Sequence, residues 1–166
     1  MINEQIKELE TLIDKEIDGY KNIEKLYTDK KEILIQGKAT DLYDVDSKIV
    51  NTYKEINDIS EARKNVTKTL DIPTFSMTDI INKIRTTDEN AAKKFAQKKE
   101  EVNELAKRIY KLEKINLELT KHGIYLTNKT IESMLKGANS VNKEYNNKGQ
   151  NITNDQLKMS SIVEEA

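Results

Sequence analysis

Hydrophobic residues recur three and four positions apart along most of the chain, which is the spacing of one face of an α-helix. The first such stripe runs from Ile2 to about Gln36, and Glu and Lys fill most of the other positions. Its apolar members are Ile6, Leu9, Ile13, Tyr20, Ile23, Tyr27 and Leu34. Gly37 follows, and glycine readily adopts the left-handed conformation in which helices often end. The pattern therefore predicts a long first helix over residues 2–36.

A second stripe begins at Thr40 or Asp41, either of which can cap free backbone N–H groups. Its apolar members are Leu42, Val45, Ile49, Tyr53, Ile56, Ile59, Val66 and Leu70, and Pro73 ends it. Because the turn is only about four residues long, the first two helices should be antiparallel neighbours. Arg63 also falls on this stripe, which favours an arginine that packs its stem on apolar neighbours and keeps its charged head in water.

Two capping signals follow the proline. Ser76 and Asp79 resemble a capping box for a short helix, Asp79–Arg85. Thr86 to Glu89 is the second signal, and from there one stripe continues to about Lys136. The apolar members of this stripe are Phe95, Val102, Leu105, Ile109, Leu112, Ile115, Leu119, Leu126 and Met134. At about 1.5 Å per residue this third long helix spans roughly 70 Å, against about 50 and 45 Å for the first two.

The third long helix should therefore extend past its neighbours, bend at Gly123 or contact another molecule. Beyond Gly137 the chain is rich in Asn, Lys and Ser, which favour turns over helix. We expect an all-α fold, an elongated antiparallel helical bundle or coiled coil of three long helices with one short connecting helix. Residues 1–138 should form the bundle domain, and residues 139–166 a flexible C-terminal tail with a weak amphipathic segment.

Composition narrows the class further. The chain has 166 residues, 28 basic and 29 acidic side chains, five glycines, one proline and no cysteine. So few glycines and prolines exclude a many-stranded β fold, and the lack of cysteine excludes disulfides and thiolate metal sites. The balanced charge argues against a nucleic-acid partner. No apolar run is long enough to span a membrane, and the first five residues lack the basic lead and apolar core of a secretion signal, so we expect a cytoplasmic protein.

Catalytic chemistry has little support in this sequence. Adjacent carboxylates such as Glu100 and Glu101 point to different sides of a helix, and the one histidine, His122, has no Ser, Cys or Asp constellation around it. The glycines are isolated, so no phosphate-binding loop is present. We therefore expect no enzyme activity, no metal site and no cofactor.

The late part of the third helix is less ordinary. Small or polar residues recur there every seven positions, at Asn116, Gly123, Thr130 and Gly137. At the same time the apolar face widens to include Leu117, Leu119, Ile124, Leu126, Ile131, Met134, Leu135 and Ala138. A helix that is apolar over more than one stripe contacts more than one neighbour, which predicts a surface for a partner helix. The bundle's own helices or a second copy of the chain, in a homodimer, are the alternative occupants.

Four short elements, in this order and spacing, are similar to those of flagellar export chaperones of the FlgN type. They are the turn Gly37–Asp41, the end of the second helix at Glu61-Ala62-Arg63, the Asn-x-x-Leu element Asn116–Leu119 and the Tyr-x-x-x-Gly element Tyr145–Gly149. The chain resembles this family over about residues 2–150.

The resemblance implies a cytoplasmic chaperone that hydrolyses no ATP itself. It would bind the terminal helical segments of flagellar hook-associated proteins, prevent their premature assembly or degradation, and deliver them to the flagellar export gate. The docking residues for such a client helix would be Leu119, Leu126, Ile131, Met134 and Leu135.

The tail has a candidate role in the same hypothesis. Its apolar residues, Leu157, Met159, Ile162 and Val163, would fold on the client or cover the empty surface, since a tethered segment competes at high effective concentration. From the resemblance, Tyr145 would contact the gate or the client. Two alternatives stay open: a coiled-coil scaffold protein with no client, and a chaperone for another secreted substrate.

Overall fold

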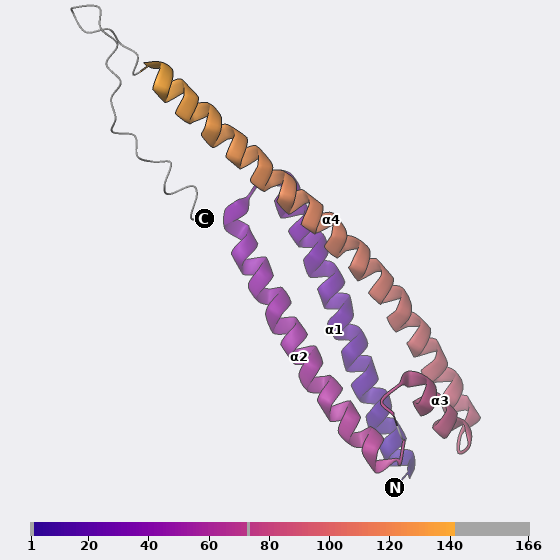
Figure 1. The fold of residues 1–166 in the computed structure, drawn as a ribbon. Coiled ribbons are helices and arrows are strands. Elements are labelled where there is room, and N and C mark those ends of the chain that lie inside the picture. The colour runs from indigo at the N-terminus through magenta and orange to yellow at the C-terminus, as the bar shows by residue number, and fades with distance from the viewer. Residues whose placement is uncertain (1, 73, 142–166) are drawn as a thin grey trace, which may run out of the picture. The chain divides into compact units, whose positions relative to one another are not determined.

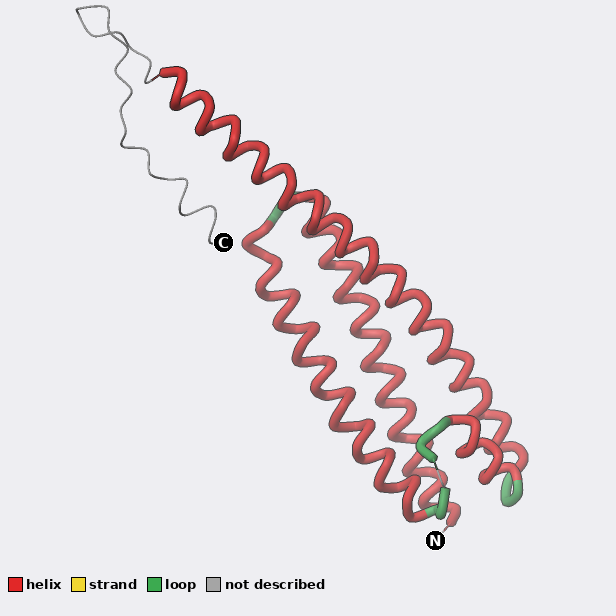
Figure 2. The backbone as a smooth tube through the Cα atoms, viewed as in Figure 1, coloured by secondary structure: helices red, strands yellow, loops and turns green. Residues whose placement is uncertain are grey.

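The computed structural model describes residues 2–72 and 74–141, and over these it consists of helices and short loops (Figures 1 and 2). The α-helices are α1 (Ile2–Gln36), α2 (Leu42–Thr69), α3 (Met77–Arg85) and α4 (Glu89–Val141), and one turn of 3-10 helix, Ala39–Asp41, precedes α2. No strand occurs in these two ranges. The predicted all-α fold is confirmed, and the predicted bounds of the first helix match α1.

The chain divides into two compact units, residues 1–121 and 122–166. The first contains α1, α2, α3 and the part of α4 up to Lys121. The second begins at His122, and its described part is the remainder of α4. The helix is continuous through Gly123 and ends at Val141, so residues 139–141 of the predicted tail are helical.

Two glycines shape the hairpin of α1 and α2. Gly37 has φ 67° and ends α1, with its N–H donating to the carbonyl of Leu34 at 3.2 Å. Gly19 lies at a close approach of the two helices, because a Cβ added there would lie 2.6 Å from Cγ1 of Ile56. The missing side chain lets the two backbones pack closely.

The starts of α3 and α4 are capped by side chains. The Ser76 hydroxyl accepts from the N–H groups of Thr78 at 3.1 Å and Asp79 at 3.4 Å, as the capping signal predicted, although α3 begins at Met77. At the start of α4, the Asp88 carboxylate accepts from the N–H of Ala91 at 3.0 Å.

Buried side chains of the first unit form two clusters. One lies at the end that contains α3 and draws on all four helices; its members are Ile6, Leu9, Ile13, Ile17, Val66, Leu70, Ile72, Ile80, Ile81, Ile84, Ala92, Phe95 and Leu105. The other draws on α1, α2 and α4 only; its members are Ile23, Leu26, Tyr27, Val45, Ile49, Ile56 and Ile109. The short helix α3 therefore completes the core at one end of the unit.

The interpretation of Arg63 as a solvated arginine is wrong. Its side chain is 13% exposed, and its Nε donates to Oε1 of Glu16, which is 11% exposed, at 2.9 Å. A second donor, Nη1, bonds the carbonyl of Phe75 at 3.2 Å in the segment that leads to α3. A carboxylate on α1, 47 residues away in the sequence, keeps this charged head out of water.

Candidate partner-binding surface

Apolar side chains are exposed along the second unit's part of α4. Ile124, Tyr125, Leu126, Ile131 and Met134 are all among the large hydrophobic side chains left open to solvent. Every residue from 122 to 138 is exposed except Leu135, which is half-buried. Several large apolar side chains exposed on one segment commonly mark a protein interaction site. We call Ile124, Leu126, Ile131, Met134 and Leu135 the distal α4 surface.

Three of the predicted docking residues lie openly on this surface, since Leu126, Ile131 and Met134 are 50, 37 and 68% exposed. Leu135 is half-buried, and Leu119 is half-buried but belongs to the first unit. Tyr145, Leu157 and Ile162 lie outside the described residues.

Helical spacing separates the distal α4 surface into sides. Ile124, Ile131 and Leu135 follow one another at intervals of seven and four residues, so they form one stripe, with Met134 at its border. Leu126 falls on a different side of the helix. The distal α4 surface therefore consists of one stripe and the separate side chain of Leu126, so a partner that contacts all of it wraps the helix or brings more than one segment.

Several polar groups of this segment bond to partners within it. The hydroxyl of Thr127 donates to the carbonyl of Gly123, and that of Thr130 to the carbonyl of Leu126, both at 3.0 Å. Lys129 pairs with Glu132 at 3.0 Å, and its hydrogen bond lowers the pKa of that carboxyl below its usual value. These groups are therefore partly satisfied without a partner.

The small-residue seam includes one residue with a different role. Asn116 is only 3% exposed, and its Nδ2 donates to the carbonyl of Tyr27 on α1 at 2.9 Å. Its Oδ1 is buried and accepts no hydrogen bond from the described residues. Asn116 is thus an inner contact of the first unit and is not open to a partner. At Gly123 an added Cβ would meet nothing within 4 Å.

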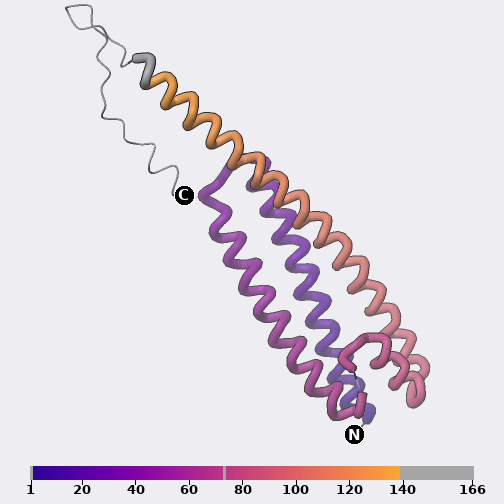
Figure 3. Tube along the Cα trace, in the orientation of Figure 1, coloured from indigo at the N-terminus to yellow at the C-terminus, as the bar shows by residue number. Residues whose placement is uncertain are grey.

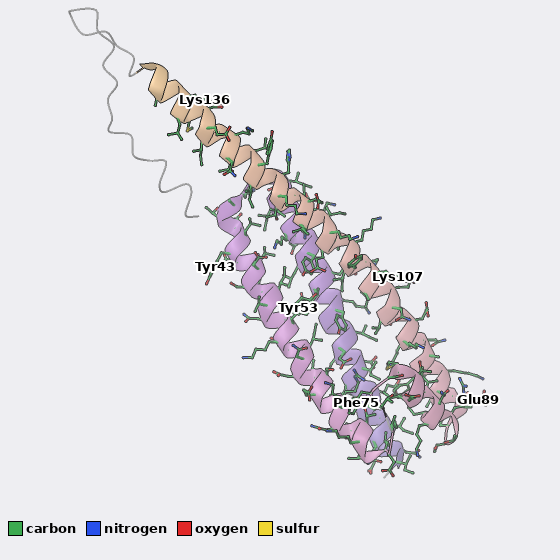
Figure 4. The ribbon with its side chains drawn as sticks, in the orientation of Figure 1. Tyr43, Tyr53, Phe75, Glu89, Lys107 and Lys136 are labelled. Atoms are coloured by element: carbon green, nitrogen blue, oxygen red, sulfur yellow. The ribbon has the colours of Figure 1, made fainter. Side chains whose placement is uncertain are left out.

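A groove in the first unit was not predicted from the sequence. It has a volume of about 260 Å³ and is lined by Tyr20, Tyr53, Val102, Ala106, Ile109, Tyr110 and Glu113. We call it the tyrosine groove; Figure 4 labels Tyr53 on α2. Ala106, Tyr110 and Glu113 lie off the predicted apolar stripe of α4, so periodicity alone gave no signal for them.

Burial affects two phenols of the first unit, that of Tyr20, which lines the groove, and that of Tyr27, next to Tyr53. Burial, followed by the neighbouring Glu16 carboxylate, raises the pKa of Tyr20. Burial and the nearby Tyr53 hydroxyl raise the pKa of Tyr27 well above its usual range. These hydroxyls are therefore neutral donors and acceptors at any physiological pH.

Within residues 2–72 and 74–141, no group of three or more His, Cys, Asp or Glu side chains is placed to hold a metal ion. In the same part of the chain, no helix combines the length and the apolar character needed to cross a membrane.

No curated protein and no solved structure matches the chain significantly. A sequence model of one family, described as FlgN protein, matches residues 1–153, which is well over half of the chain and includes all four helices. The chain therefore belongs to the FlgN family of flagellar export chaperones.

Proposed function

We propose that this protein is a cytoplasmic chaperone that binds the terminal helical segments of flagellar hook-associated proteins and delivers them to the flagellar export gate. The observation that carries the proposal is the distal α4 surface, where Leu126, Ile131 and Met134 stay open to solvent. A client helix that lays its apolar face on the stripe of Ile124, Ile131 and Leu135 would be shielded from premature assembly.

The size of the surface suits a reversible complex. Fully burying a large aliphatic side chain contributes about 1.5–3 kcal/mol, and those of the distal α4 surface start partly covered, so together they contribute roughly 5 kcal/mol. Association costs about 4–15 kcal/mol in lost freedom, so the client must add further contacts to bind at all. The net binding free energy is then small, so the client can be released at the gate.

Residues 139–166 enter the proposal as a second client-binding element. Leu157 and Ile162 would pack on the client, and Tyr145 would contact the client or the gate. Since α4 reaches Val141, the informative truncation removes residues 142–166 and leaves the helix intact. The truncated chain should keep its helical circular dichroism and its melting temperature, and bind client more weakly. Loss of the folded bundle would show that the tail belongs to the core.

The direct test mixes the purified chain with the hook-associated proteins encoded in the same genome and follows co-elution in size exclusion chromatography. Met134→Glu should weaken the complex, because it places a charge on an exposed apolar position. Lys136→Glu, on the polar side of the same helix, is the matched control. If both variants bind the client as tightly as the unaltered chain does, the distal α4 surface is not the docking site.

A second copy of the chain is the competing occupant of the same surface, as a coiled-coil scaffold without a client would require. Sedimentation equilibrium distinguishes the two. The proposal expects a distal α4 surface that is open in the free protein, so a tight dimer abolished by Met134→Glu would favour the scaffold.

A further inference from the structure

The three long helices of the first unit have a central member. Side chains of α2 and α4 are anchored to α1, by Arg63 with Glu16 at 2.9 Å and by Arg108 with Glu24 at 2.5 Å. Figure 3 shows α1 between α2 and the first part of α4. Two outer helices on one central helix leave a concave side, and a four-helix bundle would fill it with a fourth helix.

At one end of the unit, α3 takes that fourth position. Its isoleucines, Ile80, Ile81 and Ile84, are buried against residues of α1, α2 and α4. On α4, Nζ of Lys99 donates to the Thr78 hydroxyl at 2.9 Å. On the side of α2, Nζ of Lys64 lies 6.0 Å from the ring centre of Phe75, just before α3. The chain thus shows how a helix is held in this position.

The same three helix faces continue past α3 and line the tyrosine groove. On α4, Val102, Ala106 and Glu113 follow Lys99 by three, seven and fourteen residues, and therefore share its face. On α1, Tyr20 follows Glu16 by four residues, and on α2, Tyr53 precedes Lys64 by eleven. On all three helices the groove residues lie on the same side of the residues that hold α3, measured along the bundle. The groove therefore continues, unfilled, the position that α3 occupies.

We infer that the tyrosine groove receives an amphipathic helix of the client in line with α3, so that chaperone and client complete a four-helix arrangement. This inference rests on the proposed function. The lining contains one acid, Glu113, and no base. The client helix therefore carries an apolar stripe, polar groups for the Tyr20 and Tyr53 hydroxyls, and a Lys or Arg that faces Glu113.

Charge favours a client over the chain's own tail. The amphipathic segment 154–165 has one lysine, Lys158, against Asp155, Glu164 and Glu165, so it would bring net negative charge to Glu113. A client helix in the groove would contact the same faces of α1, α2 and α4 that already bind α3.

The test uses full-length protein and a purified hook-associated protein from the same genome that binds it. Ala106→Arg fills the groove and Glu113→Lys reverses its charge, and both positions are exposed, so the fold should be kept, as circular dichroism melting will check. Each substitution should weaken binding about tenfold by isothermal titration calorimetry. The matched control is Glu100→Lys, the same charge change at an exposed position of α4 outside the groove.

Position supplies an independent readout. A photo-crosslinking amino acid at position 106 should capture the client helix, and the same amino acid at position 100 should not. Unchanged affinity of both groove variants, or crosslinks only to a second copy of the chain or to its tail, would overturn this inference and leave the proposed function standing. If the unaltered chain binds no hook-associated protein, the inference and the proposed function are both overturned.

Discussion

Arg63 of α2 donates to Glu16 of α1 at 2.9 Å, and the two side chains form a charge pair that is almost entirely withdrawn from water. The same arginine bonds the Phe75 carbonyl at 3.2 Å. One side chain therefore joins the hairpin to the segment that positions α3, next to the start of the tyrosine groove.

Replacing Arg63 with Met should destabilise the fold, because Glu16 is then a nearly buried charge without its partner. Removing one member of a buried pair costs about 3–5 kcal/mol. Urea unfolding followed by circular dichroism measures this loss. The double variant Glu16→Leu/Arg63→Met should recover most of the stability, since it buries no charge. If the single variant is as stable as the unaltered protein, the pair contributes nothing.

We expect Asn116 to help align α4 on α1 without adding to the free energy of unfolding. Its Nδ2 bonds the Tyr27 carbonyl, but its buried Oδ1 accepts no hydrogen bond from the described residues. Asn116→Leu removes that unsatisfied oxygen, so the free energy of unfolding should stay the same or rise by about 1 kcal/mol. Asn116→Ala, which leaves space, should lower it. A large loss in the leucine variant would show that the hydrogen bond itself stabilises the fold.

The sequence predicted helices well because their signals are local. The apolar spacing and Gly37 define α1, and Ser76 caps α3 where its capping signal lies. The partners of Arg63 and Asn116 were not predicted, since Glu16 and Tyr27 are 47 and 89 residues away in the sequence. Periodicity marks a residue as inward but does not say which atom it meets.

The tyrosine groove was missed for the same reason. It exists because the nine-residue helix α3 fills only one end of the concave side, a property of three-dimensional packing. The exposed residues of the distal α4 surface were accessible to sequence reasoning because they widen the apolar face of a single helix.

Two glycines inside long helices should respond differently to alanine. At Gly19 the new Cβ would lie 2.6 Å from Cγ1 of Ile56, so the buried Ile56 side chain or the helices must shift, and such overpacking costs about 1–3 kcal/mol. At Gly123 the new Cβ meets nothing within 4 Å, and alanine favours helix over glycine by about 1 kcal/mol. Thermal melts should show a lower midpoint for Gly19→Ala and, for Gly123→Ala, no loss.

Acid should weaken the contact between α1 and α4 through Glu24. The Arg108 guanidinium donates to Glu24 and lowers the pKa of that carboxyl below its usual value of 4.5. A carboxyl whose pKa is lower in the folded state stabilises the fold above its unfolded pKa, and this contribution is lost as the pH falls through the folded pKa. The loss should therefore appear below about pH 4.5.

Glu24→Gln isolates that contribution, because the amide has the same shape and does not titrate. Melting midpoints between pH 3 and 7 should fall less steeply below pH 4.5 for the variant than for the unaltered protein, and the two curves should converge in acid. Because the Arg108 side chain is 53% exposed, added salt should shrink the difference at neutral pH. Parallel curves throughout this range would show that Glu24 and Arg108 do not couple the two helices.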